Sequence, residues 1–127
     1  MLGAGGVGGY FGARLHEVGG DVTFLVRPKR AELLSQQGLI VETPSQTIRI
    51  QPQLVTKDKL QHRYDLVMLS PKAYDLEDAL ETVKTVPGNP LYLPLLNGFD
   101  HLKQMDDEFG RDRVMGGVAH IAGSANL

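Results

Sequence analysis

The 127-residue sequence contains no cysteine and no tryptophan. Without cysteine, the chain cannot form a disulfide, use a thiolate as a nucleophile or build a cysteine zinc site. It also lacks an apolar run of about 18 residues, which a membrane-spanning helix requires. Its start does not show the basic, apolar and small-residue order of a signal peptide. Together these absences predict a cytoplasmic protein that does not cross a membrane.

Clusters of positive charge are missing as well. No run of Lys and Arg forms a basic patch and the net charge is −2, so nothing indicates nucleic-acid binding. The histidines lack the spacing of metal ligands, and we expect no metal site; they are His16, His62, His101 and His120. Hydrophobic residues make up 42% of the chain, which is ordinary for a globular domain. We expect one domain over residues 1–127, and the sequence gives no indication of its oligomeric state.

A glycine-rich loop stands almost at the first residue. Gly3-Ala4-Gly5-Gly6-Val7-Gly8 follows the pattern G-x-G-x-x-G. In such loops the first glycine makes a tight turn, the second admits a pyrophosphate, and the third lets a helix pack closely on a strand. The start of that helix offers unpaired N–H groups and a positive dipole end to the anion. The alternative is a glycine turn with a purely structural role.

The residues after this loop favour the dinucleotide interpretation. Apolar residues recur at helical spacing and lie on one face of a helix: Val7, Phe11, Leu15 and Val18. Gly19-Gly20 is suited to end that helix, and residues 22–26 read as a buried strand. Only Met1 and Leu2 remain for the strand before the loop, which is normally central to the sheet. Either the chain is a fragment, or its start was placed downstream of the natural one.

Strands and helices are predicted to alternate along the rest of the chain. We expect helices at 28–37, 74–86 and 100–109, and strands at 39–42, 47–50, 54–55, 65–70, 91–96 and 114–121. The nearly continuous apolar run at 65–70 is typical of a strand covered on both faces. Pro94 suggests a strained or peripheral position for its strand. The predicted fold class is α/β, a Rossmann-like doubly wound and mainly parallel sheet with a truncated first strand.

The residue after the second strand indicates which coenzyme is used. Rossmann domains that prefer NAD place Asp or Glu there to hold the ribose 2′-hydroxyl. This chain has Arg27, with Lys29 and Arg30 close by. A guanidinium can pair with a 2′-phosphate through two charge-assisted hydrogen bonds, whereas a carboxylate would repel it. The sequence therefore predicts NADP(H); the alternative is a solvated arginine at a strand end.

The chain resembles the ketopantoate reductases (2-dehydropantoate 2-reductases) over essentially all its length. The resemblance is carried by GAGGVGGYFGARL at 3–15, DVTFLVR at 21–27, DLVMLSPKAYD at 65–75, LPLLNGFD at 93–100 and MGGVAHIA at 115–122. It implies an NADP-dependent oxidoreductase that reduces a small 2-keto acid, ketopantoate, to pantoate on the route to pantothenate and coenzyme A.

The resemblance also implies a set of site residues. Gly3 to Gly8 would cradle the pyrophosphate and Arg27 would hold the 2′-phosphate. Lys72 and Ala122 match cofactor-contacting positions, and Asn97 matches an asparagine that contacts both cofactor and substrate. Because Lys72 and Asn97 each follow an apolar run, both are expected at carboxyl ends of parallel strands, where such sheets bind ligands. The alternatives are a surface lysine and an Asn-Gly turn, and Ser70-Pro71 departs from the small or apolar residues usual in the family.

We assign no catalytic residue in this chain. In the family that it resembles, a second, helical domain supplies the proton donor and most of the substrate pocket, and that domain is absent here. Two other functions stay open beside the reductase. One is a non-catalytic NADP-binding or sensor module, and the other is a related 2-keto acid or opine-type dehydrogenase.

Overall fold

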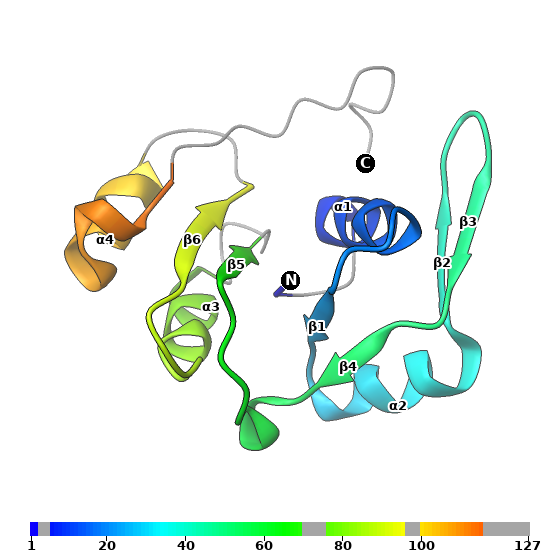
Figure 1. Cartoon of the computed structure of the whole chain (residues 1–127), viewed down its shortest axis with the longest axis horizontal. Coiled ribbons are helices and arrows are strands. Elements are labelled where there is room, and N and C mark those ends of the chain that lie inside the picture. The colour runs from blue at the N-terminus through cyan, green and yellow to red at the C-terminus, as the bar shows by residue number, and fades with distance from the viewer. Residues whose placement is uncertain (3–5, 70–75, 96–99, 116–127) are drawn as a thin grey trace.

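A computed structural model of the chain describes residues 1–2, 6–69, 76–95 and 100–115. Helices and strands alternate along most of it (Figure 1). The helices are α1 (Gly6–Glu17), α2 (Pro28–Gln37), α3 (Leu76–Val83) and α4 (Asp100–Phe109). The strands are β1 (Thr23–Leu25), β2 (Leu39–Glu42), β3 (Thr47–Ile50), β4 (Gln53–Val55), β5 (Leu66–Leu69) and β6 (Leu91–Pro94). These elements agree with the predicted order, and β2 and β3 have the predicted bounds, whereas α3, β1, β5 and β6 are shorter than expected.

The main sheet is parallel, with the start of the chain at its centre. β1 pairs with β4 and β5 pairs with β6, both in parallel. Leu2 joins the two pairs, because it bridges Leu25 of β1 on one side and Leu69 of β5 on the other. Val114 forms a further parallel bridge to Tyr92 of β6. Numbered as strands of a Rossmann domain, this order is 3-2-1-4-5-6, as expected for a doubly wound sheet.

Helices cover the two halves of the sheet on opposite faces. Successive strand residues point to opposite faces, and register partners share a face. Leu2, Leu25 and Leu69 therefore point to one side, and Phe24 points to the other. Phe24 packs with residues of α1 and α2, whereas Leu69 packs with residues of α3 and α4. The sheet is thus doubly wound, as the sequence predicts.

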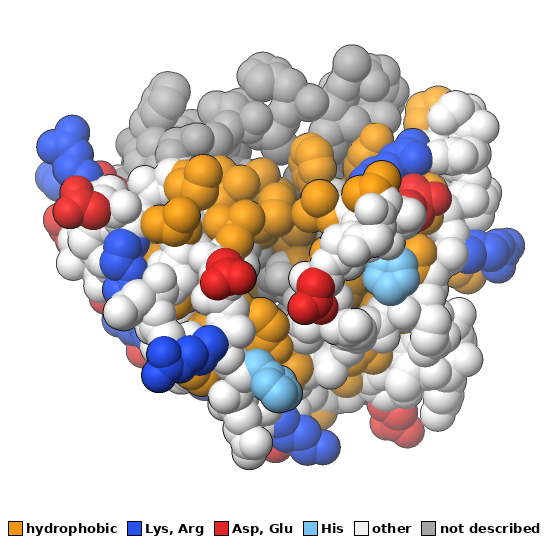
Figure 2. Space-filling view, in the orientation of Figure 1, with side chains coloured by type: hydrophobic (Ala, Val, Ile, Leu, Met, Phe, Trp, Pro, Cys, Tyr) orange, Lys and Arg blue, Asp and Glu red, His pale blue; other side chains and the backbone are white. Residues whose placement is uncertain are grey.

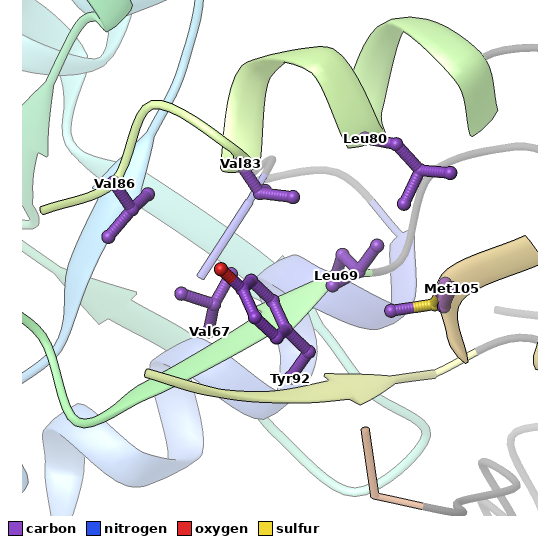
Figure 3. Packing of buried hydrophobic residues seen from close by; sticks show 7 residues of the cluster. All are labelled: Val67, Leu69, Leu80, Val83, Val86, Tyr92 and Met105. Carbon is purple, nitrogen blue, oxygen red and sulfur yellow. The ribbon is translucent and has the colours of Figure 1, made fainter. Parts of the chain in front are cut away.

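A buried hydrophobic cluster lies between α3, α4 and the β5–β6 pair (Figure 3). Its residues are Val67, Leu69, Leu80, Val83, Val86, Tyr92 and Met105. The Tyr92 ring stacks on Phe109 with 4.0 Å between centroids. Lys84 of α3 forms ion pairs with Glu81 at 3.0 Å and with Glu108 of α4 at 2.6 Å. These contacts hold both helices against one face of β5 and β6.

The helix end predicted at Gly19-Gly20 is confirmed, and a hairpin follows β2. α1 ends in a Schellman motif, in which Gly20 N–H donates to the Leu15 carbonyl and Gly19 N–H to that of His16, with Gly19 at φ +87°. Residues 43–46 form the turn of an antiparallel hairpin between β2 and β3, closed by a Thr43 N–H to Gln46 carbonyl bond of 2.8 Å. The hairpin lies beside α1 and outside the parallel sheet (Figure 1).

The apolar face predicted for the first helix is packed only in part: Phe11 is half-buried, but Leu15 and Val18 are not buried. Leu15 is 39% exposed, and Val18 lies beyond the helix end and is 82% exposed. The buried positions of α1 are instead its small residues, Gly8, Gly9, Gly12 and Ala13. The helix approaches the sheet too closely for larger side chains there, so the largest apolar residues do not mark the packed face.

Pro94 was predicted to give its strand a strained or peripheral position, and β6 is the outer strand of the β5–β6 pair, with the Val114 bridge on its far side. Pro94 is the last residue of β6, is fully buried, and pairs in register with Leu69. The next ladder bond comes from Leu95, whose N–H donates to the Leu69 carbonyl at 2.8 Å. A proline at the strand end therefore leaves the pairing of β5 and β6 intact.

The strand at 65–70 is not covered on both faces by the described residues. One face of β5 and β6 packs against α3 and α4, as above. On the other face, Leu66 and Leu91 are paired in register and are 41% and 42% exposed. Hydrophobic side chains gather over β5 and β6 on the face shown in Figure 2.

Two further expectations concern the ends of elements. Of the last predicted strand, 114–121, Val114 forms its bridge to Tyr92, and residues 116–121 lie outside the described residues. Helix α3 begins at Leu76, and Tyr74 and Asp75 of the predicted helix also lie outside them. None of the described helices has the length and apolar character that crossing a bilayer requires.

Candidate functional site

The carboxyl edge of the parallel sheet is where the candidate residues are expected to meet. The chain runs outward from Leu2 to β1 and β4 in one direction, and to β5 and β6 in the other. The strand order therefore reverses between Leu2 and β5. In open α/β sheets, ligands bind outside the carboxyl ends of the strands at such a switch point.

Helix α1 begins at this edge. Only three residues separate Leu2 from the first residue of α1, Gly6. The first turn of α1 contains no acidic side chain, and Gly8 and Gly9 are buried. A helix start of this kind presents backbone N–H groups and a positive dipole end without a carboxylate to compete for them. Of the predicted loop, Gly3, Ala4 and Gly5 lie outside the described residues, whereas Gly6, Val7 and Gly8 belong to α1.

Gly12 allows α1 to lie close to the sheet. A Cβ atom at this position would come within 2.4 and 2.5 Å of two ring carbons of Phe24 in β1. Phe24 is fully buried, so its ring cannot turn out into solvent to make room without a shift of the packing around it. Gly12 thus fixes how near the helix start comes to the strand that carries Arg27, a role that the sequence interpretation missed. The available signal was a second glycine four residues after Gly8, on the same helical face.

Arg27 lies at the carboxyl end of β1, as predicted. It follows buried Val26, has extended backbone, and precedes Pro28 at the first position of α2. Its side chain is 79% exposed, and its Nη2 donates a hydrogen bond to Oδ2 of Asp78 at 2.5 Å. Lys29 and Arg30 are exposed in the first turn of α2. The guanidinium is therefore at the surface near other positive charges, with a carboxylate as its partner.

Asp78 is a second residue that the sequence interpretation missed. It lies in the first turn of α3, 51 residues after Arg27, and its side chain is 65% exposed. The ion pair joins the end of β1 to the start of α3, which follows β5. Arg27 and Asp78 thus come from opposite sides of the switch point. No local sequence signal could have paired two residues so far apart.

The remaining candidate residues, Lys72, Asn97 and Ala122, lie outside the described residues. The strands that precede the first two are placed: β5 ends at Leu69 and β6 at Pro94, both parallel and side by side. Since the carboxyl ends of neighbouring parallel strands share one edge, the chain enters both segments at the edge where Leu2 ends.

A hollow of about 360 Å³ elsewhere on the surface is separate from this edge. It runs beside β4 and is lined by residues that include Gln53, Lys59, His62 and Tyr64, but neither by Arg27 nor by Asp78. Among the residues that the structure describes, no group of three or more His, Asp or Glu side chains could hold a metal ion.

The residues at the switch point fit a dinucleotide. A helix start free of acidic side chains suits a diphosphate, and an exposed guanidinium one strand away suits the ribose end. This fit depends on the described geometry of α1 and β1.

Comparison with known proteins identifies relatives of this chain. It is 41% identical over 122 residues to the uncharacterized oxidoreductase YkpB of Bacillus subtilis, covering 95% of this chain and 40% of that protein. It is 30% identical over 118 residues to 2-dehydropantoate 2-reductase of Pyrococcus horikoshii, covering 93% of this chain and 38% of that protein. The chain thus spans about two fifths of the length of these relatives.

Solved structures share the fold. The 2-dehydropantoate 2-reductase of Methylococcus capsulatus aligns with a TM-score of 0.81 at 21% identity, over 94% of this chain and 40% of that one. D-Mandelate dehydrogenase with NADH and anilino(oxo)acetate aligns with a TM-score of 0.78 at 23% identity, over 90% of this chain and 39% of that one. Both support a Rossmann-type dehydrogenase fold.

A family model covers nearly the whole chain. The one described as "Ketopantoate reductase PanE/ApbA" matches residues 1–126. With the parallel sheet and the glycine-started helix in place, this match confirms the resemblance seen in the sequence. The chain belongs to the ketopantoate reductase PanE/ApbA family of oxidoreductases.

Proposed function

We propose that this chain is the NADP(H)-binding part of an oxidoreductase that reduces 2-dehydropantoate to pantoate. The observation that carries the proposal is the exposed guanidinium of Arg27 at the carboxyl end of β1, at the same edge as the start of α1. A 2′-phosphate is what distinguishes NADP from NAD, and an arginine here can pair with it.

Each candidate residue has a proposed role. Gly3, Ala4, Gly5, Gly6, Val7 and Gly8 would hold the pyrophosphate against the start of α1, and Arg27 would hold the 2′-phosphate. Lys72 and Ala122 would contact the cofactor. Asn97 would contact cofactor and substrate, since its amide has both donors and an acceptor. The bound cofactor would supply the hydride, and the chain would orient it.

The substrate is proposed from the relatives' names and not from a described pocket. The chain spans 38% of the Pyrococcus 2-dehydropantoate 2-reductase, and we assign it no proton donor. Cofactor binding is therefore the activity expected of these residues alone. Oxidation of NADPH by a protein that carries this segment, measured with ketopantoate and other 2-keto acids, tests the substrate. Turnover with a different 2-keto acid only would favour a related dehydrogenase, and binding without turnover on any would favour a sensor.

Replacing Arg27 tests the coenzyme. Arg27→Ala should weaken NADPH binding about 10- to 100-fold, because a charge-assisted contact of about 1.5–3 kcal/mol is lost. NADH, which has no 2′-phosphate, should bind as before. Titration followed by calorimetry or by nicotinamide fluorescence measures both dissociation constants.

The matched control is Arg49→Ala, which removes an exposed arginine from β3, a strand outside the parallel sheet. It should leave both affinities unchanged. If the parent chain binds neither coenzyme, or if Arg27→Ala weakens NADH as much as NADPH, the proposed function is wrong.

A further inference from the structure

We propose that Asp78 sets the coenzyme preference of this site by competing with the 2′-phosphate for Arg27. The inference rests on the proposed NADP(H)-binding function and adds a specificity-determining residue to it. The observation behind it is the Arg27–Asp78 ion pair, which crosses the switch point of the sheet.

The ion pair occupies the guanidinium that would bind the 2′-phosphate. Nη2 of Arg27 donates to Oδ2 of Asp78 at 2.5 Å, one contact between one nitrogen and one oxygen. A phosphate is best held when both terminal nitrogens of a guanidinium face it in a fork. To adopt that geometry, Arg27 must release Asp78 or share a nitrogen with it.

Charge determines the direction of the effect. The 2′-phosphate is an anion, and while it occupies Arg27 the Asp78 carboxylate lies a few ångströms away with the same sign. Because both side chains are largely exposed, 79% and 65%, the pair is screened by water and is worth little by itself. The carboxylate should therefore weaken NADPH binding by a modest factor and leave NADH nearly unaffected.

The first turn of α3 supplies a matched control. Glu77 precedes Asp78, is also exposed, and has the same charge at the same helix start. Removing either carboxylate costs the same favourable interaction with the helix dipole. Only Asp78 has the described contact with Arg27.

The experiment compares coenzyme affinities in three variants of the chain. Asp78→Asn should tighten NADPH binding about threefold in about 20 mM salt, and the gain should shrink at about 500 mM salt, as screening predicts. NADH affinity should change by less than about twofold in the same titrations, since NADH has no 2′-phosphate to compete with Asp78 for Arg27. Asp78→Glu, which keeps the charge, should bind both coenzymes like the parent chain, and so should Glu77→Gln.

A gain in affinity is a result that structural damage would not produce. If Asp78→Asn weakens NADPH binding, Asp78 orients Arg27 and does not compete with the phosphate, and the inference is overturned. An equal gain in Glu77→Gln would also overturn it, because the effect would then come from net charge. Binding of neither coenzyme by the parent chain would instead refute the proposed function.

Discussion

In a chain that begins at Met1, the α-amino group is an ionisable group that is largely buried beside β1. It donates a hydrogen bond to the Thr23 carbonyl at 2.8 Å, and burial lowers its pKa from 8.0 to about 6. The unfolded chain therefore binds a proton below about pH 8, whereas the folded chain does so only below about pH 6. Folding is favoured when this group is neutral.

This shift predicts that stability falls as the pH is lowered from 8 to 6. A chain that starts at Met1 should lose about 2 kcal/mol of unfolding free energy over that interval, with no further loss from this group below it. Denaturant unfolding at several pH values measures the slope. An N-acetylated chain is the control, since it keeps an N–H donor for Thr23 but cannot be protonated. Equal slopes in the two chains would contradict the prediction.

Single residues of the site could be predicted from sequence only where the signal was local. Arg27 was found because it directly follows an apolar strand and precedes a proline that starts a helix. Asp78 could not be found, because its contact with Arg27 depends on the tertiary arrangement of β1 and α3. The roles of Lys72, Asn97 and Ala122 stay predictions.

At the scale of elements, the close packing of α1 on β1 restricts which side chain fits at position 12. Gly12→Ala should destabilise the fold by about 1–3 kcal/mol, because the new methyl group would overlap the buried Phe24 ring. Helix propensity alone would give the opposite sign, since alanine favours a helix by about 1 kcal/mol over glycine. Thermal or denaturant unfolding of the variant decides between the two.

The double variant Gly12→Ala with Phe24→Leu serves as the control for this contact. A smaller side chain at position 24 should recover part of the loss caused by the methyl group, so the two changes should not be additive. Strict additivity would mean that the helix can shift away from β1 without cost.

Elements with clear ends were predicted well, and their packed faces less well. Pro28 and Gly38 delimit α2 at its observed bounds, because proline restricts φ to a helical value and glycine permits the φ of +74° that ends the helix. The buried face of α1 was predicted incorrectly from Leu15 and Val18, since periodicity of large residues does not reveal a close approach through glycines. The strand with Pro94 lies at the outer side of the β5–β6 pair, and the bonds that Leu91 and Leu95 donate to β5 do not need an N–H at Pro94.

At the scale of the whole molecule, two residues connect two cores. Met1 packs against the cluster around Phe24, and Leu2 packs against the cluster around Leu69. Leu2 N–H donates to the Met68 carbonyl, and Leu25 N–H donates to the Met1 carbonyl, each at 2.8 Å. Among the described residues, these two bonds link β1 to β5, so we expect them to contribute to the cooperative unfolding of the two halves.

Leu2→Pro should make the β1–β4 half and the β5–β6 half of the sheet open independently of each other. Proline removes the N–H that bonds to Met68, so the link to β5 is lost while the bond from Leu25 to Met1 can persist. Hydrogen exchange followed by NMR should give β1 and β5 the same opening free energy in the parent chain. In the variant these values should diverge by about 1 kcal/mol or more. Leu2→Val, which keeps the donor, is the control, and equal values for both strands in Leu2→Pro would argue against the link.

The half-exposed leucines of β5 and β6 have a practical consequence. Leu66 and Leu91 stand side by side on a face that α3 and α4 do not cover. An exposed apolar patch of this kind promotes association between copies of the chain in concentrated solution. We therefore expect self-association to limit the concentration at which this polypeptide stays in solution. A charged side chain at position 66 should raise that concentration.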